Sequence, residues 1–271
     1  MTVATDLFRG GTYMSNAHAA AEARPVSMRG TVTSHIEAVY HRSTTCEACS
    51  LRPGCLPRLV KTSGLAEFST LARLKRKVQR GRELFRAGAA LTSLYVVRSG
   101  TFKMVTVSHD GRPKITGFYL TGDLMGLEAI SGGVSTVDAV TLEDSEVCIL
   151  PVAQLEDLAS RVPELMKELI RVLSAEISRD NRLTTLLGCL DAEHRVVRFF
   201  TNLADRYARL GYARDALLLH MTRDDIASYL GLATETVSRV ISRLARSGVL
   251  NVHQRHVEFN DCAGLAALGQ W

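Results

Sequence analysis

The sequence predicts an α+β chain in which a β domain precedes a helical region. From about Val78 to Pro151, short apolar runs alternate with glycine turns. Such runs, separated by turns roughly every eight to twelve residues, indicate a β-sandwich or barrel. After Pro151 the apolar residues recur with the period of a helix. A third observation, a C-terminal pair of short helical segments followed by two short strands, adds a smaller second domain.

The composition is that of an ordinary globular chain. Of 271 residues, 46% are hydrophobic and 23% charged, which suits two domains of ordinary size. No window approaches the roughly 18 apolar residues of a membrane helix, and the N-terminus lacks a signal-peptide core. We therefore expect a cytoplasmic protein whose thiols stay reduced and form no disulfide framework. A net charge of +5 and a pI near 9.0 suit nucleic acid or an acidic partner.

Composition and period divide the chain into four regions. They are an N-terminal arm without sustained period, a cysteine loop with the β domain, one long helix and a C-terminal domain, over residues 1–40, 41–160, 161–188 and 189–271. We expect the arm to be flexible. Two further helices are predicted, a short one near Leu65–Leu74 and a second over about Ala192–Leu210.

The long helix carries one narrow apolar seam between Pro163 and about Gly188. At 1.5 Å per residue it would span roughly 37 Å, and a seam of this kind usually packs against a partner helix. Packing against its own domain is the alternative. Asp180 interrupts the seam, where two paired helices would bring two carboxylates together. The residues expected in a dimer interface are Leu169, Leu173, Ile177, Asp180 and Leu187.

The segment "MTRDDIASYLGLATETVSRVISRLARSGVL" predicts a helix-turn-helix. Thr222 can cap the first helix with Asp225 as its reciprocal partner, and Gly231 allows the tight turn that follows. We expect Thr234 to cap the second helix. One side of that helix is apolar, and the other carries Glu235, Ser238, Arg239, Ser242 and Arg243.

The stretch "VLNVHQRHVEF" then predicts two strands around Gln254–Arg255, which would add a wing. A second helix with a polar outer face is what a reader of the major groove requires, since Arg can contact guanine and Glu can contact cytosine there. A helical hairpin with a purely structural role is the alternative. We predict that the protein binds double-stranded DNA.

Three thiols lie within ten positions in "TTCEACSLRPGCLPRLV", at Cys46, Cys49 and Cys55. Because we expect the cysteines to stay reduced, the remaining explanations are a zinc site, an iron–sulfur cluster or chance. A four-iron cluster needs a fourth ligand. The remaining cysteines are Cys148, Cys189 and Cys262.

In this order the segments resemble the CRP/FNR family of bacterial transcription regulators, and within it the oxygen-sensing FNR branch. The resemblance covers roughly Cys46 to Gly264 and includes the cysteines, "SLYVVRSGTFK", "ITGFYLTGDLMGLEAI", the long helix and "TETVSRVISRL". It implies a jelly-roll sensor domain of the cyclic-nucleotide-binding kind (a β-roll), a dimerisation helix and a winged helix-turn-helix. It also implies a homodimeric transcription regulator and not an enzyme.

The resemblance assigns roles to individual residues. The family's E-x-x-S-R pattern is matched by Glu235, Ser238 and Arg239, the expected base readers on an inverted repeat of TTGAT-type half-sites. Contacts to phosphate, or merely solvated side chains, are expected at Thr222, Arg223, Thr236 and Arg243. The turn Asp110–Lys114 is the implied contact to RNA polymerase, with an ordinary hairpin turn as the alternative.

The FNR branch also carries C-x2-C-x5-C and a lone cysteine in a strand, matched by Cys46, Cys49, Cys55 and Cys148. One 4Fe-4S cluster per subunit is therefore implied, since thiolate is a soft ligand that suits iron. In the family the acid at the Asp180 position keeps the cluster-free form monomeric, and oxygen destroys the cluster and releases DNA. A structural zinc site is the alternative, because four cysteines also bind zinc. Cys189 and Cys262 are expected to be structural, and His41 to be a surface residue.

Two other functions fit the sequence less well. Nucleotide-binding relatives carry an acid after the glycine where Leu127 follows Gly126, and an arginine before a serine or threonine. No arginine precedes Ser135 or Thr136, so a phosphate would lack its cation and we expect no cyclic nucleotide. No convincing hydrolytic motif supports an enzyme, and an electron carrier would not need the DNA reader.

Overall fold

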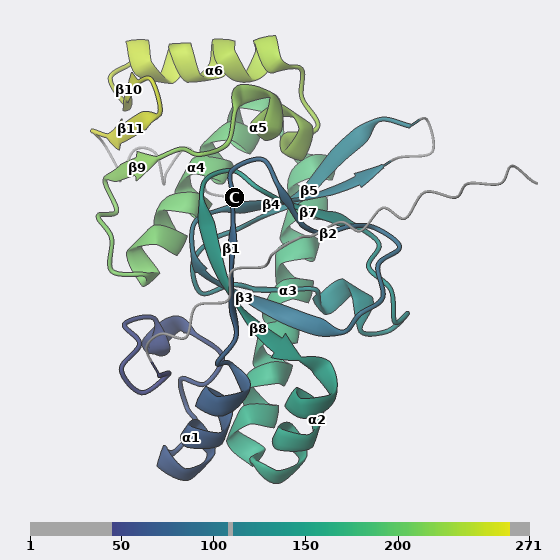
Figure 1. Ribbon diagram of the computed structural model, residues 1–271. Helices are drawn as coiled ribbons and strands as arrows, with labels where there is room; N and C mark the ends of the chain where they lie inside the picture. The colour runs from purple at the N-terminus through teal and green to yellow at the C-terminus, as the bar shows by residue number, and fades with distance from the viewer. Residues whose placement is uncertain (1–44, 108–110, 261–271) are drawn as a thin grey trace, which may run out of the picture. The chain divides into compact units, whose positions relative to one another are not determined.

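The computed structural model describes residues 45–107 and 111–260 (Figure 1). The expected arm over residues 1–40, His41, Asp110 and Cys262 lie outside the described residues. The chain divides into two units, Met1–Glu37 and Ala38–Trp271, and everything described belongs to the second. No helix among the described residues is long and apolar enough to cross a membrane.

The β domain is a sandwich of two four-stranded antiparallel sheets, which confirms the predicted architecture. One sheet has the order β1 (Lys75–Val78), β8 (Ser145–Pro151), β3 (Ser93–Ser99), β6 (Leu124–Met125). The other has the order β2 (Glu83–Phe85), β7 (Asp138–Thr141), β4 (Phe102–Val107), β5 (Pro113–Tyr119). Alternate side chains fill the space between them, among them the fully buried Val97, Phe102 and Val147.

The first strand begins three residues before the predicted boundary because β1 pairs with β8 from Lys75 onward, opposite Cys148.

The turn into β4 requires glycine at position 100. Gly100 has φ +94°, and a Cβ there would lie 2.0 Å from the Ser145 hydroxyl oxygen. Glycine is the residue that tolerates this left-handed backbone.

A second core lies beside the sheet of β8. It is formed by α1 (Thr62–Leu71), α2 (Val152–Arg161), the start of α3 and residues Leu56 and Val60 of the cysteine loop. The helix expected near Leu65–Leu74 thus starts and ends three residues earlier, because the chain must enter β1 at Lys75. A short 3-10 turn, η1 (Arg52–Gly54), lies within the cysteine loop, and another, η2 (Leu127–Ala129), follows β6.

The long helix α3 (Pro163–Cys189) runs past the β domain from α2 toward the C-terminal domain (Figure 1). Its 27 residues span about 40 Å. Proline stands at its first position, which suits a helix start, and extended backbone at Leu190 ends it. Asp191 then caps α4 (Ala192–Arg209) by accepting a hydrogen bond from the His194 backbone N–H.

The C-terminal domain contains α5 (Arg223–Leu230), α6 (Thr234–Arg246) and the strand order β10 (Leu250–His253), β11 (His256–Phe259), β9 (Ala216–Leu218). The two predicted wing strands are confirmed, and β9 adds a third that the sequence analysis missed. The reciprocal cap between Thr222 and Asp225 and the left-handed turn at Gly231 are also present. The expected cap at Thr234 is wrong. Ala233 is the N-cap of α6, because the Thr234 hydroxyl instead donates to Asp224 at 2.6 Å.

Candidate metal centre and DNA-reading helix

The cysteine segment, defined here as residues 46–60, packs beside β8. Cys46, Cys55 and Cys148 all contact the apolar cluster that includes Leu56 and Val60. The Cys46 backbone N–H donates to the Ser69 hydroxyl at 2.9 Å, which ties the segment to α1. Three of the four predicted ligands therefore share one apolar neighbourhood, and the fourth, Cys49, is half-buried.

Burial dominates the electrostatics of Cys55 and Cys148. Together with the negative charge of the neighbouring Cys148, it raises the pKa of Cys55 to about 12. Burial likewise raises the pKa of Cys148 to about 11, where the charge of Lys75 opposes it and that of Cys46 adds to it. A lone thiolate is unfavourable here, whereas a bound cation would offset the charge.

Soft donors around one apolar cluster suit a thiolate-bound metal, so the residues fit the group that the resemblance implies. The thiols are not gathered closely enough to form a metal site, however. Within residues 45–107 and 111–260, no three His, Cys, Asp or Glu side chains form a group that could hold a metal ion. Cys189 is exposed at the end of α3 and belongs to no such neighbourhood.

Ser135, which no arginine precedes, lies in the loop between η2 and β7. Here the Ser135 hydroxyl contacts Glu128 Oε1 at 2.9 Å and the Val137 carbonyl at 2.8 Å. The serine therefore lies beside a carboxylate. A second anion at this position would be repelled.

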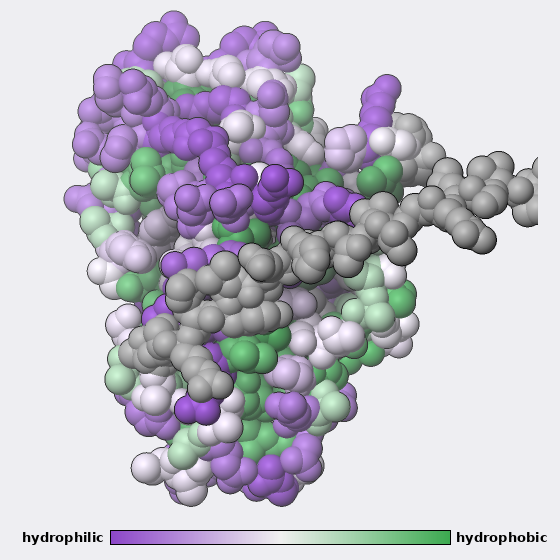
Figure 2. Space-filling view, viewed as in Figure 1, coloured by the Kyte–Doolittle hydropathy of each residue, from purple (hydrophilic) through white to green (hydrophobic). Residues whose placement is uncertain are grey.

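The α6 helix presents a polar outer face. Val237, Val240, Ile241 and Leu244 are buried beneath it, whereas Glu235 and Arg239 are exposed and Ser238 is half-buried. Hydrophilic side chains cover this end of the molecule, at the top of the view in Figure 2. Within the described part of the chain, Arg239 makes only long local contacts, to the Glu235 carbonyl and the Thr236 hydroxyl at 3.4 Å each. Its guanidinium can therefore turn to a ligand.

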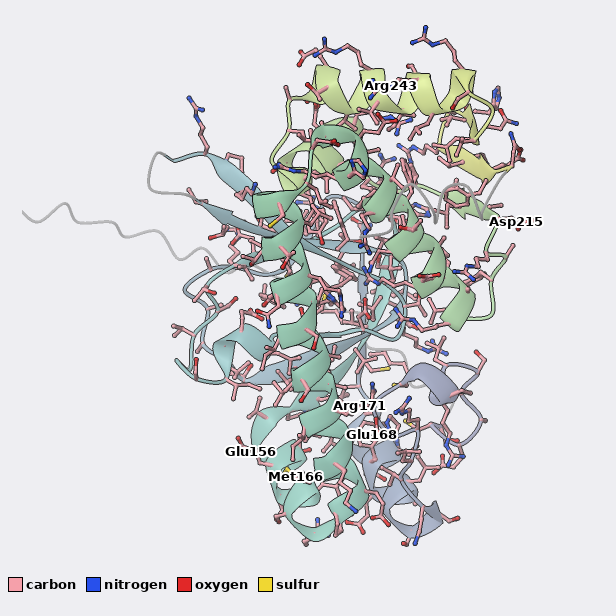
Figure 3. The ribbon with its side chains drawn as sticks, turned by 180° about the vertical axis from the view of Figure 1, so that it is seen from behind. Glu156, Met166, Glu168, Arg171, Asp215 and Arg243 are labelled. Atoms are coloured by element: carbon pink, nitrogen blue, oxygen red, sulfur yellow. The ribbon has the colours of Figure 1, made fainter. Side chains whose placement is uncertain are left out.

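The other expected DNA contacts differ from one another. Arg243 (labelled in Figure 3) forms an ion pair with Glu193 of α4 at 2.7 Å. Arg223 is half-buried, and its Nη1 atom is the one buried side-chain nitrogen or oxygen in the described part of the chain without a hydrogen-bond partner. Burial lowers the pKa of Arg223. Thr222 is engaged in the α5 cap, and Thr236 is half-buried.

An exposed apolar row follows α3. It consists of Met166, Ile170, Leu173 and Ile177, with exposed fractions of 42%, 56%, 37% and 62%, and we call it the α3 stripe. Asp180 continues the same spacing and is exposed. Of the expected interface residues, Leu169 packs against its own chain's second core. Leu187 lies 3.6 Å from the Cβ position of Gly231 in the helix-turn-helix. The sequence analysis missed Ile170, although it lies four residues after Met166 and three before Leu173, which is the spacing of one helix face.

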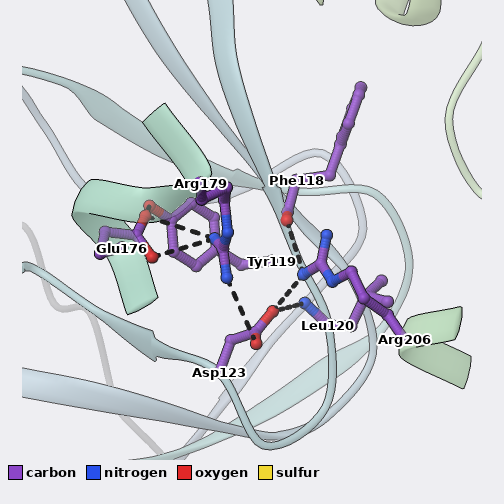
Figure 4. A network of polar contacts seen from close by, with 7 residues as sticks. All are labelled: Phe118, Tyr119, Leu120, Asp123, Glu176, Arg179 and Arg206. Atoms are coloured by element: carbon purple, nitrogen blue, oxygen red, sulfur yellow. Dashed lines mark hydrogen bonds and ion pairs between the residues drawn. The ribbon is translucent and has the colours of Figure 1, made fainter. Parts of the chain in front are cut away.

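A polar junction joins the turn after β5 to α3 and α4 (Figure 4). Asp123 accepts hydrogen bonds from Arg206 of α4 and from the Leu120 backbone N–H, and lies 3.7 Å from Arg179 of α3. The Tyr119 hydroxyl donates to Glu176 at 2.5 Å, and the Arg179 guanidinium stacks 5.0 Å from the Tyr119 ring centre. The sequence offered no signal for this junction because its partners come from three distant segments.

The β domain also contacts the helix-turn-helix directly. Lys103 Nζ of β4 lies 2.6 Å from Asp225 Oδ1, and the Ile115 backbone N–H donates to the Ser228 hydroxyl at 3.0 Å. Burial alone would raise the pKa of Asp225. The hydrogen bonds from Lys103 and Thr222 outweigh burial and lower it. A lysine of the β domain thus contacts the carboxylate that caps α5.

Comparison with known proteins gives two matching family models. Residues 75–162 match the cyclic nucleotide-binding domain, and residues 194–268 match the Crp-like helix-turn-helix domain. Among solved structures, FixK2 from Bradyrhizobium japonicum superposes with a TM-score of 0.67 at 27% identity, over 73% of this chain and 97% of that one.

Curated relatives cover most of the chain. It is 39% identical over 223 residues to the fumarate and nitrate reduction regulatory protein of Salmonella typhimurium, covering 82% of this chain and 89% of that protein. It is 38% identical to the anaerobic regulatory protein of Haemophilus influenzae, with coverage of 82% and 87%. These findings confirm the resemblance drawn from the motifs. The chain belongs to the CRP/FNR family and is an FNR-like DNA-binding transcription regulator of the anaerobic response, not an enzyme.

Proposed function

We propose that this regulator responds to oxygen through one 4Fe-4S cluster per subunit, held by Cys46, Cys49, Cys55 and Cys148. The observation that carries the proposal is the packing of three of these thiols against one apolar cluster beside β8. When bound, the cluster would be the part of the protein that oxygen degrades. Cys148 provides a ligand fixed in the sheet, and the cysteine segment provides the other three from a loop that can close over it.

The α3 stripe is the surface through which two subunits would pair. Pairing places two copies of α6 on one DNA duplex, so Glu235, Ser238 and Arg239 of each subunit would read one half of a TTGAT-type inverted repeat. Without the cluster, the two Asp180 carboxylates oppose pairing. A monomer loses the second half-site, and its affinity for the operator falls.

Three further assignments accompany this proposal. The Asp110–Lys114 turn, of which residue 110 lies outside the described residues, is the proposed contact to RNA polymerase. A transcription regulator of this family acts in the cytoplasm. The carboxylate of Glu128 beside Ser135 argues against a cyclic nucleotide as the effector.

The test uses protein purified without oxygen. We expect about four iron and four sulfide ions per chain, a broad visible absorption band, and fluorescence-anisotropy binding to an inverted-repeat duplex that weakens after exposure to air. A duplex with one scrambled half-site is the control. A colourless protein with one zinc per chain and unchanged binding in air would instead support the structural zinc site.

A further inference from the structure

Glu168 is a buried carboxylate on α3 that the sequence analysis did not single out. Its side chain is 1% exposed, and its Oε2 atom contacts Arg58 Nε at 3.0 Å and Arg171 Nε at 2.7 Å. Figure 3 shows Glu168 and Arg171 side by side on α3. A buried carboxylate is costly unless it is paired, and these two guanidinium groups offset the cost of burying it.

The two partners come from different parts of the chain. Arg171 lies on the same helix, three residues away. Arg58 belongs to the cysteine segment, 110 residues away in the sequence. The Arg58 contact is therefore a direct bond between the cysteine segment and the long helix.

Arg58 and a predicted metal ligand are the two ends of one turn. The Arg58 backbone N–H donates to the Cys55 carbonyl at 3.1 Å, and the two residues between them, Leu56 and Pro57, are buried. Leu56 is part of the second core. A hydrogen-bonded turn with a buried centre moves as a unit, so a displacement of Cys55 displaces Arg58 as well.

Glu168 lies on the face of α3 opposite the α3 stripe. At about 100° per residue, the nine positions between Glu168 and Ile177 place them about 180° apart. Leu165, one turn before Glu168, is also buried, whereas Ile170 and Ile177 are exposed. The cysteine segment therefore holds one face of the helix whose other face carries the proposed dimer contacts.

We propose that the Cys55–Arg58 turn and Glu168 form a link through which ligand binding at the thiols sets the position of α3 and hence the affinity between subunits. Arg58 and Glu168 are positioning residues in this scheme. The inference rests on the proposed cluster-dependent dimerisation and deepens it by naming the contact that carries the signal.

The test compares Arg58→Gln with Arg171→Gln in the full chain. Each removes one partner of Glu168, but only Arg58→Gln breaks the bond between segment and helix. The readout is the dimer dissociation constant from sedimentation, measured before and after exposure to air. The samples that are compared have the same iron content per chain before exposure. We expect the air-to-anaerobic ratio of these constants to fall at least about tenfold in Arg58→Gln and to stay within about threefold of wild type in Arg171→Gln.

Glu168→Gln should behave as Arg58→Gln. Glu164→Gln is the matched control, because Glu164 makes a more exposed contact, to Lys61 at 3.7 Å, and should leave the ratio unchanged. Circular dichroism checks that each variant folds, and Arg58 is suited to substitution since its side chain is 34% exposed.

Equal ratios in Arg58→Gln and Arg171→Gln would overturn the inference, since a merely structural role makes the two partners equivalent. Loss of iron from Arg58→Gln would overturn it too, because Arg58 would then support cluster binding itself. Failure of the proposed function looks different: wild type would lack the cluster, or its dimer affinity would not change in air.

Discussion

Replacing Asp180 with alanine should make the protein dimeric in air. Asp180 is exposed and continues the spacing of the α3 stripe one turn beyond Ile177. Two subunits paired along the stripe would bring two copies of this carboxylate together. Removing it leaves the apolar contacts intact and deletes the repulsion.

The magnitude follows from the exposed area of the stripe. The exposed fractions of Met166, Ile170, Leu173 and Ile177 add to about two whole side chains per subunit. At about 1.5–3 kcal/mol for each buried side chain, pairing would gain about 6–12 kcal/mol per dimer, against an association cost of about 4–15 kcal/mol. The balance lies near zero. Two carboxylates about 5–8 Å apart, at an effective dielectric constant of about 20, repel by about 2–3 kcal/mol, enough to decide it.

We therefore expect Asp180→Ala to tighten the dimer of air-exposed protein about 30- to 150-fold at low salt, measured by sedimentation equilibrium. Asp180→Asn should act similarly because it removes the charge and keeps the shape. Asn181→Ala, a neutral change at the next position, is the control. The reasoning is refuted if Asp180→Ala is no more dimeric in air than wild type, or if higher salt fails to narrow the difference between them.

Three further predictions concern the metal site, the DNA-reading helix and pH. Cys148→Ser should lose most of the iron of anaerobically purified protein while Cys189→Ser keeps it; full iron in the first variant would remove Cys148 from the ligand set. Arg239→Ala should weaken binding to the inverted repeat about tenfold or more and binding to a scrambled duplex much less, and equal losses would show a phosphate contact. The hydrogen bond from Lys103 helps to hold the pKa of Asp225 below its unfolded value. The stabilisation that the ionised Asp225 carboxylate provides is therefore present above roughly pH 4 and is lost as pH falls through the folded pKa. The melting temperature should drop less between pH 5 and pH 3 in Asp225→Asn than in wild type, and identical drops would contradict this assignment.

Local sequence predicted the elements whose causes are local. The apolar period of α3 and the reciprocal cap of α5 depend on residues a few positions apart, and both are present. The cap of α6 was misplaced because the Thr234 hydroxyl bonds to Asp224 on the preceding helix. The three-residue strand β9 has too little pattern of its own and is defined by its pairing with β11.

The candidate sites follow the same division. The cysteine spacing pointed to a metal centre, and three of the thiols share one apolar cluster. The bond between Arg58 and Glu168 could not be predicted, because each side chain reads as a surface charge until the fold brings them together. The apolar row of α3 was drawn through Leu169, whereas the exposed position is Ile170, a difference that depends on which face the second core covers.

The most direct test of the whole account follows both cluster and assembly in one sample. Anaerobic protein is titrated with oxygen and examined by sedimentation velocity, with detection at a visible wavelength for the cluster and in the ultraviolet for the protein. The account predicts that the dimer fraction falls in step with the visible absorbance and reaches its minimum when the four thiols have lost their ligand. A dimer that persists after the colour is gone, or a monomer that keeps its colour, would contradict it.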